Sequence, residues 1–152
     1  MQVLLILHNL FRWLILLFAF WTLLSALSGL SGKKEYTAGD GRSNFFFMLS
    51  MDIQLLIGLI LYFSGAWFER LKHLGENMKD PMLRFFTMEH GVLMIIAWIL
   101  VHVGRISVKK ATTPTAKFKK TLLFFGIALL LILIAIPWPF REAVARPWFR
   151  WF

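Results

Sequence analysis

The chain has 152 residues, and its 59% of apolar residues and mean hydropathy of +0.68 lie above the range of soluble globular proteins. Its net charge of +9 is carried by short segments between apolar runs, where basic residues meet lipid head groups, so we expect a lipid bilayer as partner and no nucleic acid. The absence of cysteine excludes disulfides, thiolate catalysis, Cys-ligated iron–sulfur clusters and covalently attached haem.

Four segments are apolar over the roughly 20 residues that a bilayer-spanning helix needs. The first is long enough to predict a retained span rather than a cleaved signal peptide. Asp80 and Pro81 supply an N-cap and a first-turn proline for the third segment, and Pro137 and Pro139 stop the fourth. The predicted spans are residues 3–27, 44–63, 81–104 and 114–136.

Two segments outside the predicted spans have the composition of a membrane interface. Residues 67–79 mix apolar and charged side chains, which predicts a short surface helix between spans two and three. The tail, residues 137–152, alternates Arg with Trp and Phe and is typical of an interfacial anchor. Because the connections are short, we predict an all-α integral membrane protein, with residues 1–152 forming one up-down-up-down four-helix bundle.

The distribution of Lys and Arg predicts the orientation of this bundle. The side that follows spans one and three has nine of them, and the opposite side has seven, so we predict both termini on the outer side. The nine are Lys33, Lys34, Arg42, Arg105, Lys109, Lys110, Lys117, Lys119 and Lys120, and the seven are Arg70, Lys72, Lys79, Arg84, Arg141, Arg146 and Arg150.

Histidines at matched depths in spans one and three form the main candidate site, because ionisable groups inside a bilayer are expensive and are often functional. His8 and His90 each lie about five residues, or roughly 8 Å, below the same surface. Spans one and three are diagonal neighbours in an up-down bundle, so the two imidazoles are expected to serve as axial ligands of one haem b between them. The alternative is that each histidine bonds only to a carbonyl or an acid within the bundle.

Four more residues are expected around such a haem. Met94 and Trp98 follow His90 at i+4 and i+8, where they would pack against a porphyrin or equally against another helix. Arg70 and Arg84 lie on the same side as the histidines, where they would pair with haem propionates or with lipid phosphate.

Further polar residues within the spans need partners. Arg12 is too deep for an unpaired cation, so we predict contact with the haem site and an ion pair with Glu89 or Asp52. Asp52 and Gln54 could hydrogen-bond a quinone head group, although a contact between helices also explains them. We interpret His102 as an interfacial histidine near the basic side.

Short segments give the chain a family resemblance. They are His8-Asn9-Leu10-Phe11-Arg12-Trp13, residues 54–63, Met88-Glu89-His90-Gly91 and Ile136-Pro137-Trp138-Pro139-Phe140-Arg141. With them the sequence resembles, over nearly its whole length, a group of small bacterial four-helix membrane proteins described as cytochrome-b-like. The resemblance implies a haem-b electron carrier of the bacterial inner membrane, with His8 and His90 at the family's histidine positions. In such a membrane, the outer side predicted for both termini by the Lys and Arg count is the periplasmic side.

Three functions follow from these observations. The first is a haem-b electron-transfer protein or respiratory-complex subunit that exchanges electrons with a quinone or another membrane redox partner, and is a carrier more than a stand-alone enzyme. The second is a cofactor-free accessory subunit of a larger membrane complex. The third is a small transporter or proton pathway built on Arg12, Asp52 and Glu89, for which no inverted repeat is visible.

Overall fold

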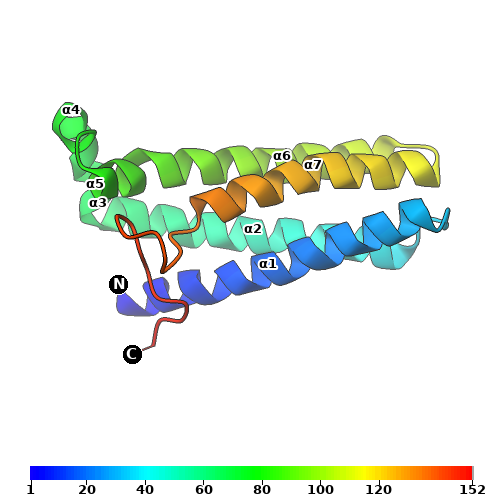
Figure 1. Ribbon diagram of the computed structural model, residues 1–152, viewed down its shortest axis with the longest axis horizontal. Coiled ribbons are helices and arrows are strands. Elements are labelled where there is room, and N and C mark those ends of the chain that lie inside the picture. The colour runs from blue at the N-terminus through cyan, green and yellow to red at the C-terminus, as the bar shows by residue number, and fades with distance from the viewer. Residues whose placement is uncertain (152) are drawn as a thin grey trace.

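The computed structural model describes residues 1–151, which form helices joined by turns and loops. Four long helical segments lie side by side along the molecule (Figure 1). They are α1 (Gln2–Ser31), α2 (Ala38–Ser64), a composite third helix of α5 (Pro81–Arg84), the π-helical turn η2 (Phe85–Glu89) and α6 (His90–Lys110), and α7 (Pro114–Ala135). Three short pieces connect α2 to the third helix, namely α3 (Ala66–Arg70), the 3-10 turn η1 (Leu71–His73) and α4 (Leu74–Asn77).

All four long segments have the length and the apolar composition needed to cross a membrane. This confirms the prediction of an all-α protein with four candidate membrane spans. α2 begins at Ala38 rather than near residue 44, because Thr37 and Asp40 form a capping box in which each side chain bonds to the backbone N–H of the other. α6 continues to Lys110, beyond the expected end at residue 104.

The third helix starts where the sequence predicts. The Asp80 carboxylate accepts a hydrogen bond from the backbone N–H of Leu83 at 2.8 Å, and Pro81 occupies the first helical position. One turn later the helix widens into η2 before it continues as α6. This π-helical turn directly precedes His90 and was not predicted from the sequence.

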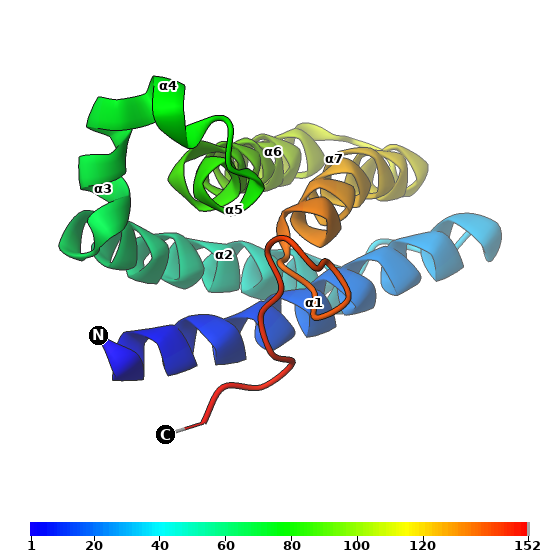
Figure 2. The same ribbon diagram turned by 60° about the vertical axis from the view of Figure 1, so that its left-hand side comes forward.

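The four long helices close into a ring. α1 contacts α2 and α7, and α6 contacts α7 and α2, so α1 and α6 occupy diagonal corners (Figure 2). Aliphatic and aromatic side chains fill the space along the bundle axis. The most deeply buried include Ile15, Ala19, Phe47, Val101, Phe125 and Ala128.

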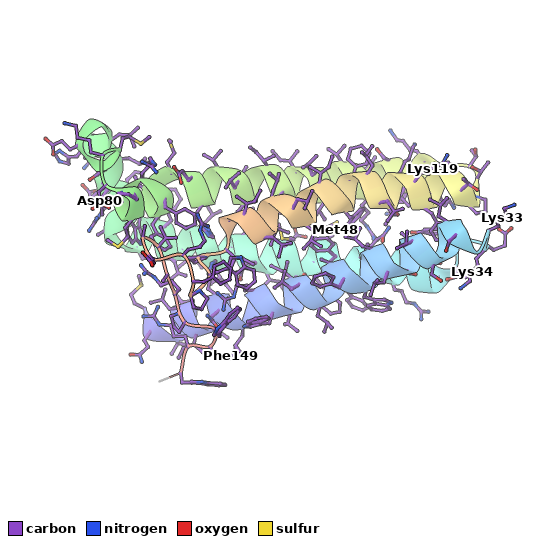
Figure 3. The ribbon with its side chains drawn as sticks, viewed as in Figure 1. Lys33, Lys34, Met48, Asp80, Lys119 and Phe149 are labelled. Atoms are coloured by element: carbon purple, nitrogen blue, oxygen red, sulfur yellow. The ribbon has the colours of Figure 1, made fainter. Side chains whose placement is uncertain are left out.

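The two ends of the bundle differ in charge. Lys33, Lys34 and Lys119 gather at one end, and Asp80 and Phe149 lie toward the other (Figure 3). We call the first the basic end, formed by the loops after α1 and α6. The second is the histidine end, because His8 and His90 belong to its half of the bundle.

Close approach between helices is concentrated toward the basic end. A Cβ atom on Gly29 would lie 2.2 Å from the Phe118 ring, and one on Gly104 would lie 2.5 Å from Cβ of Phe124. Any larger residue at either position would collide with α7. Glycine therefore sets how closely α7 packs against α1 and α6 here.

The tail after α7 folds back over the histidine end. The Trp13 ring stacks on Phe149 with ring centroids 5.3 Å apart, and its Nε1 donates to the Trp148 carbonyl at 3.1 Å. Phe140 and Trp151 remain exposed. Part of the predicted anchor is therefore packed against α1, and part of it offers aromatic rings to its surroundings.

Candidate functional site

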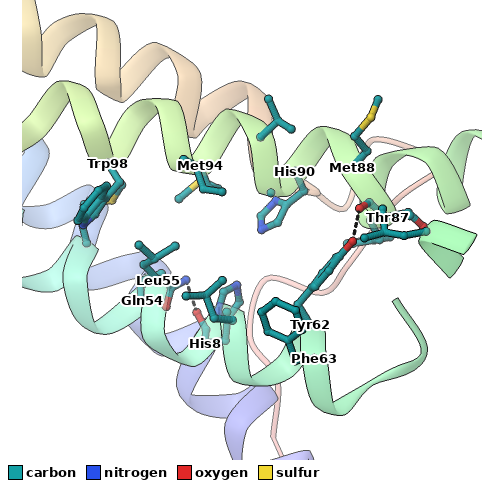
Figure 4. Close-up of a pocket in the computed structure, with 18 residues that line it drawn as sticks. His8, Gln54, Leu55, Tyr62, Phe63, Thr87, Met88, His90, Met94 and Trp98 are labelled. Carbon is teal, nitrogen blue, oxygen red and sulfur yellow. Dashed lines mark hydrogen bonds between the residues drawn. The ribbon is translucent and has the colours of Figure 1, made fainter. Parts of the chain in front are cut away.

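A cavity of about 330 Å³ opens between α2 and α6 in the histidine half of the bundle (Figure 4). Apolar side chains from these two helices form most of its wall, and His8 reaches it from α1. Side-chain hydrogen bonds join α2 to the third helix between Tyr62 and Thr87 and between Asp52 and Trp98. Of the seven predicted site residues, the structure places four around this cavity: His8, His90, Met94 and Trp98.

The two histidines lie opposite one another across this cavity. Their ring centroids are 6.2 Å apart, and the ring planes are inclined at 63°. Neither Nε2 atom has a hydrogen-bond partner among residues 1–151. The structure therefore brings together two imidazoles from diagonal helices and leaves a nitrogen of each free.

The end of α7 fixes the His90 ring. Its Nδ1 lies 2.8 Å from the carbonyl oxygen of Ala135, which can only accept, so Nδ1 carries the hydrogen and Nε2 holds a lone pair. In a continuing α-helix this carbonyl would accept from the N–H of residue 139, but Pro139 has none. α7 also ends at this point, with Ile136 extended before Pro137, so the Ala135 oxygen is left free to orient His90.

The His8 ring packs closely against the backbone of α2. A Cβ atom on Gly58 would lie 3.5 Å from Cε1 of His8, so the α2 backbone passes directly beside this ring. Gln54, one turn earlier on α2, donates from Nε2 to the His8 carbonyl at 2.9 Å. Its Oε1 and the His8 Nδ1 are both buried without a partner, and the two side chains lie side by side in Figure 4.

The π-helical turn shapes the outer rim of the cavity. The Tyr62 hydroxyl on α2 donates to the carbonyl of Thr87 in η2 at 2.7 Å and ties the two walls together. A π-turn breaks the regular ladder of backbone hydrogen bonds and often occurs at functional sites. Here it also sets the rotation at which the helix presents His90.

Trp98 lies at the inner end of the cavity and holds Asp52, which is not part of the cavity wall. The Trp98 Nε1 donates to Asp52 Oδ1 at 2.7 Å, and His102 Nε2 lies 3.2 Å from the same oxygen. His102 therefore has a carboxylate partner, which was not predicted from the sequence. The prediction that Asp52 serves as the partner of Arg12 is wrong.

Arg12 does not line the cavity. Its guanidinium donates to the backbone carbonyls of Pro147 and Trp148 in the folded-back tail. Its other predicted partner, Glu89, instead accepts a 2.6 Å ion-pair hydrogen bond from Arg84. Sequence reasoning missed the partners of Arg12 because nothing in the sequence shows where the tail folds.

The remaining two predicted residues also lie outside the cavity wall. Arg84 is occupied by Glu89 and by the Met78 carbonyl. Arg70 stands over the Trp67 ring at 4.8 Å and directly precedes Leu71, which does line the cavity. Arg70 is thus the predicted cation nearest in the chain to the cavity rim.

Among the described residues that line the cavity, His8 and His90 are the two that carry imidazole nitrogens. Within residues 1–151, no group of three His, Cys, Asp or Glu side chains converges as a metal site. A bare transition-metal ion usually takes three or four protein ligands. Two imidazoles suffice for a haem iron, because the porphyrin supplies the other four nitrogens.

Comparison with known proteins finds no relative. No family model matches the chain, no curated protein matches it, and no solved structure matches it.

Proposed function

We propose that this chain is a membrane haem-b protein in which His8 and His90 bind one iron from opposite faces. The observation that carries the proposal is the spacing of the two rings. A metal–imidazole bond is about 2 Å long, so two imidazoles bound through Nε2 across one iron have ring centroids roughly 6 Å apart. The observed 6.2 Å agrees with that requirement.

The hydrogen bonding of His90 supports the same assignment. Metal-bound histidines usually donate their second ring nitrogen to a carbonyl or carboxylate, which fixes the tautomer and the ring orientation. The His90 Nδ1–H does this toward the Ala135 carbonyl. For His8, the Gln54 Oε1 is a free acceptor in the neighbourhood of a free Nδ1.

The cavity walls suit a planar apolar group between α2 and α6. Gly91 has no atom within 4 Å of where a Cβ would lie, and Gly58 leaves only His8 beside it. Met94 and Trp98 line the wall of α6. The sequence predicts haem between spans one and three; we propose that His8 and His90 on these spans are the ligands and that α2 and α6 supply most of the walls.

Haem held in this way supplies reversible one-electron transfer. His8 and His90 would hold the iron, the Ala135 carbonyl would orient His90, and the apolar walls would keep water from most of the cavity. We assign Arg70 as the residue that pairs with a propionate at the rim, because Arg84 already has Glu89 as partner. A quinone or another membrane redox protein is the proposed electron partner.

The membrane placement belongs to the same proposal. We infer an up-down-up-down arrangement in a bacterial inner membrane, with the Lys-rich basic end facing the cytoplasm and both termini on the periplasmic side. The pieces α3, η1 and α4 would then lie on the periplasmic surface beside the haem edge.

A reduced-minus-oxidised visible spectrum of the purified protein tests the proposal. We expect a b-type spectrum in the wild type that is lost in both His8→Ala and His90→Ala, with retained helix content by circular dichroism. His73→Ala, at an exposed histidine between α2 and the third helix, is the matched control and should keep the spectrum. A folded protein that stays colourless after haem reconstitution would overturn the proposal and favour the accessory-subunit reading.

A further inference from the structure

A second polar cluster lies deeper in the bundle than the two histidine ligands. Asp52 is near the middle of α2, about 21 Å from its first residue and about 18 Å from its last. His102 on α6 faces it, with Nε2 3.2 Å from Asp52 Oδ1. Trp98 donates to the same oxygen at 2.7 Å and also lines the cavity, so it connects the cluster to the proposed haem site.

Hydrogen bonding requires a proton between Asp52 and His102. The His102 Nδ1 lies 3.0 Å from the Trp98 carbonyl, which can only accept, so Nδ1 carries a hydrogen. A neutral imidazole of this tautomer presents a lone pair at Nε2, which a carboxylate at 3.2 Å would repel. One more proton must therefore reside on Nε2 or on Asp52. In either form the pair has no net charge, and an apolar layer favours an uncharged pair over a charged one.

No other ion shares this proton. Within the part of the chain that the structure describes, Asp52 and His102 form an ion pair only with each other. Arg105, the next cation on α6, bonds to the Gly41 carbonyl and stands over the Phe45 ring. About a third of each of the two side chains is exposed at the surface of the bundle, and His102 lies three residues from Arg105, toward the basic end, where we place the exchange with water.

We propose that Asp52 and His102 share one exchangeable proton whose release is coupled to the charge of the group held by His8 and His90. The inference rests on the proposed haem site. Loss of one electron from the cavity to an acceptor such as a quinone leaves one more positive charge there and favours release of the shared proton to water. Gain of an electron from a quinol-class donor reverses both transfers.

Simple electrostatics gives the size of this coupling. His90 and Trp98 are separated by about 12 Å along α6. Two unit charges at about that distance, in an effective dielectric of about 20, change each other's affinity roughly tenfold. Because coupling is reciprocal, the proton shifts the electron affinity by the same factor.

The first test needs no haem. Nitrogen NMR of the histidine-labelled, haem-free protein in micelles follows His102, identified by the signal missing in His102→Gln. We expect Asp52→Asn to change the protonation of the His102 ring across the pH titration. Glu76→Gln, which removes an exposed carboxylate far along the connecting segment, should match the wild type. An unchanged His102 signal in Asp52→Asn overturns the shared proton.

The second test measures the midpoint potential of the haem-loaded protein against pH. We expect the low-pH limit to lie about 59 mV above the high-pH limit, which is a tenfold effect for one electron, and we expect no such step in Asp52→Asn. A wild-type potential independent of pH overturns the coupling while the haem site stands. If no haem binds, the proposed function and the coupling both fail, whereas the NMR result still decides whether the proton is shared.

Discussion

The two halves of the bundle use glycine in opposite ways. Toward the basic end, Gly29 and Gly104 lie under phenylalanine rings, and a single added methyl group would collide with α7. In the histidine half, Gly91 borders open space and Gly58 meets only the edge of the His8 ring. The same residue type therefore closes the bundle in one half and leaves it open in the other.

This difference shows what makes a cavity in a helix bundle. Glycine removes side-chain volume from both halves, and the neighbouring helix decides whether the space is filled. At the basic end α7 fills it with Phe118 and Phe124. In the histidine half α2 and α6 face one another, and the ring of His8 from α1 reaches only part of the gap.

Filling the cavity is the strongest test of the difference between the two halves. Gly91→Trp places an indole in the open space, and we expect haem content to fall to background while the protein still inserts and folds. The measurement is haem per protein after purification. Gly126→Trp is the control, because Gly126 also has open space around it but does not line the cavity. Full haem loading in Gly91→Trp would contradict the assignment of the cavity as the haem site.

A single methyl group should separate the two halves by stability. Gly104→Ala overpacks the contact with Phe124 and should lower the free energy of unfolding by about 1–3 kcal/mol. Gly91→Ala meets no atom within 4 Å and should leave it unchanged or slightly higher. Thermal unfolding in one detergent, followed by circular dichroism, compares the two variants. Equal unfolding midpoints would show that α6 and α7 leave room for a methyl group at Gly104.

The rim of the cavity should respond more weakly. Tyr62→Phe removes the bond to the Thr87 carbonyl and should destabilise the protein by about 1–2 kcal/mol, with faster amide exchange in η2. The neighbouring Ser64→Ala removes an exposed hydroxyl that makes no hydrogen bond, and it should have little effect. Unchanged exchange in η2 after Tyr62→Phe would mean that this contact does not hold the two walls together.

The smallest effect concerns a tyrosine at the basic end. Burial, followed by the charge of Asp40, raises the pKa of Tyr36 in the loop between α1 and α2 to about 12, with Arg105 acting in the opposite direction. The unfolded phenol ionises near about 10. The contribution of Tyr36 to stability is therefore complete below about pH 10 and is lost as the pH rises through about 12.

Tyrosinate absorbance checks this pH window. The difference between the wild type and Tyr36→Phe isolates one of the two tyrosines in the chain. We expect that difference to rise near pH 12. A rise near pH 10 would show that the Tyr36 loop is open to water.

Much of the fold could be predicted because apolar length and a capping side chain are local features. Asp80 capped the third helix as expected. The start of α2 was missed because Gly39 and Gly41 are typical of a loop, although Thr37 and Asp40 have the spacing of a capping box. A helix boundary that one short segment determines could be predicted. A boundary at which loop-forming glycines and a capping box compete could not.

The features of the candidate site also separate into those that the local sequence predicts and those that it does not. The depths of His8 and His90 follow from residue counting, and the structure brings their rings together. The free carbonyl of Ala135 could have been predicted from Pro137 and Pro139, because prolines end the helix here and remove the N–H to which this carbonyl would otherwise bond. The partners of Arg12 and Asp52 could not be predicted. Each partner belongs to a segment far along the chain, and the residues around Arg12 or Asp52 do not show where that segment lies.

The contact between Arg12 and the tail has a consequence for how the protein is made. The Trp148 carbonyl that receives the guanidinium lies 136 residues further along the chain. A ribosome adding about 5–20 residues per second needs roughly 7–27 s to reach it. During that interval α1 enters the membrane with a cation whose final partners have not yet been synthesised, so water or lipid phosphate must hold it until the tail arrives.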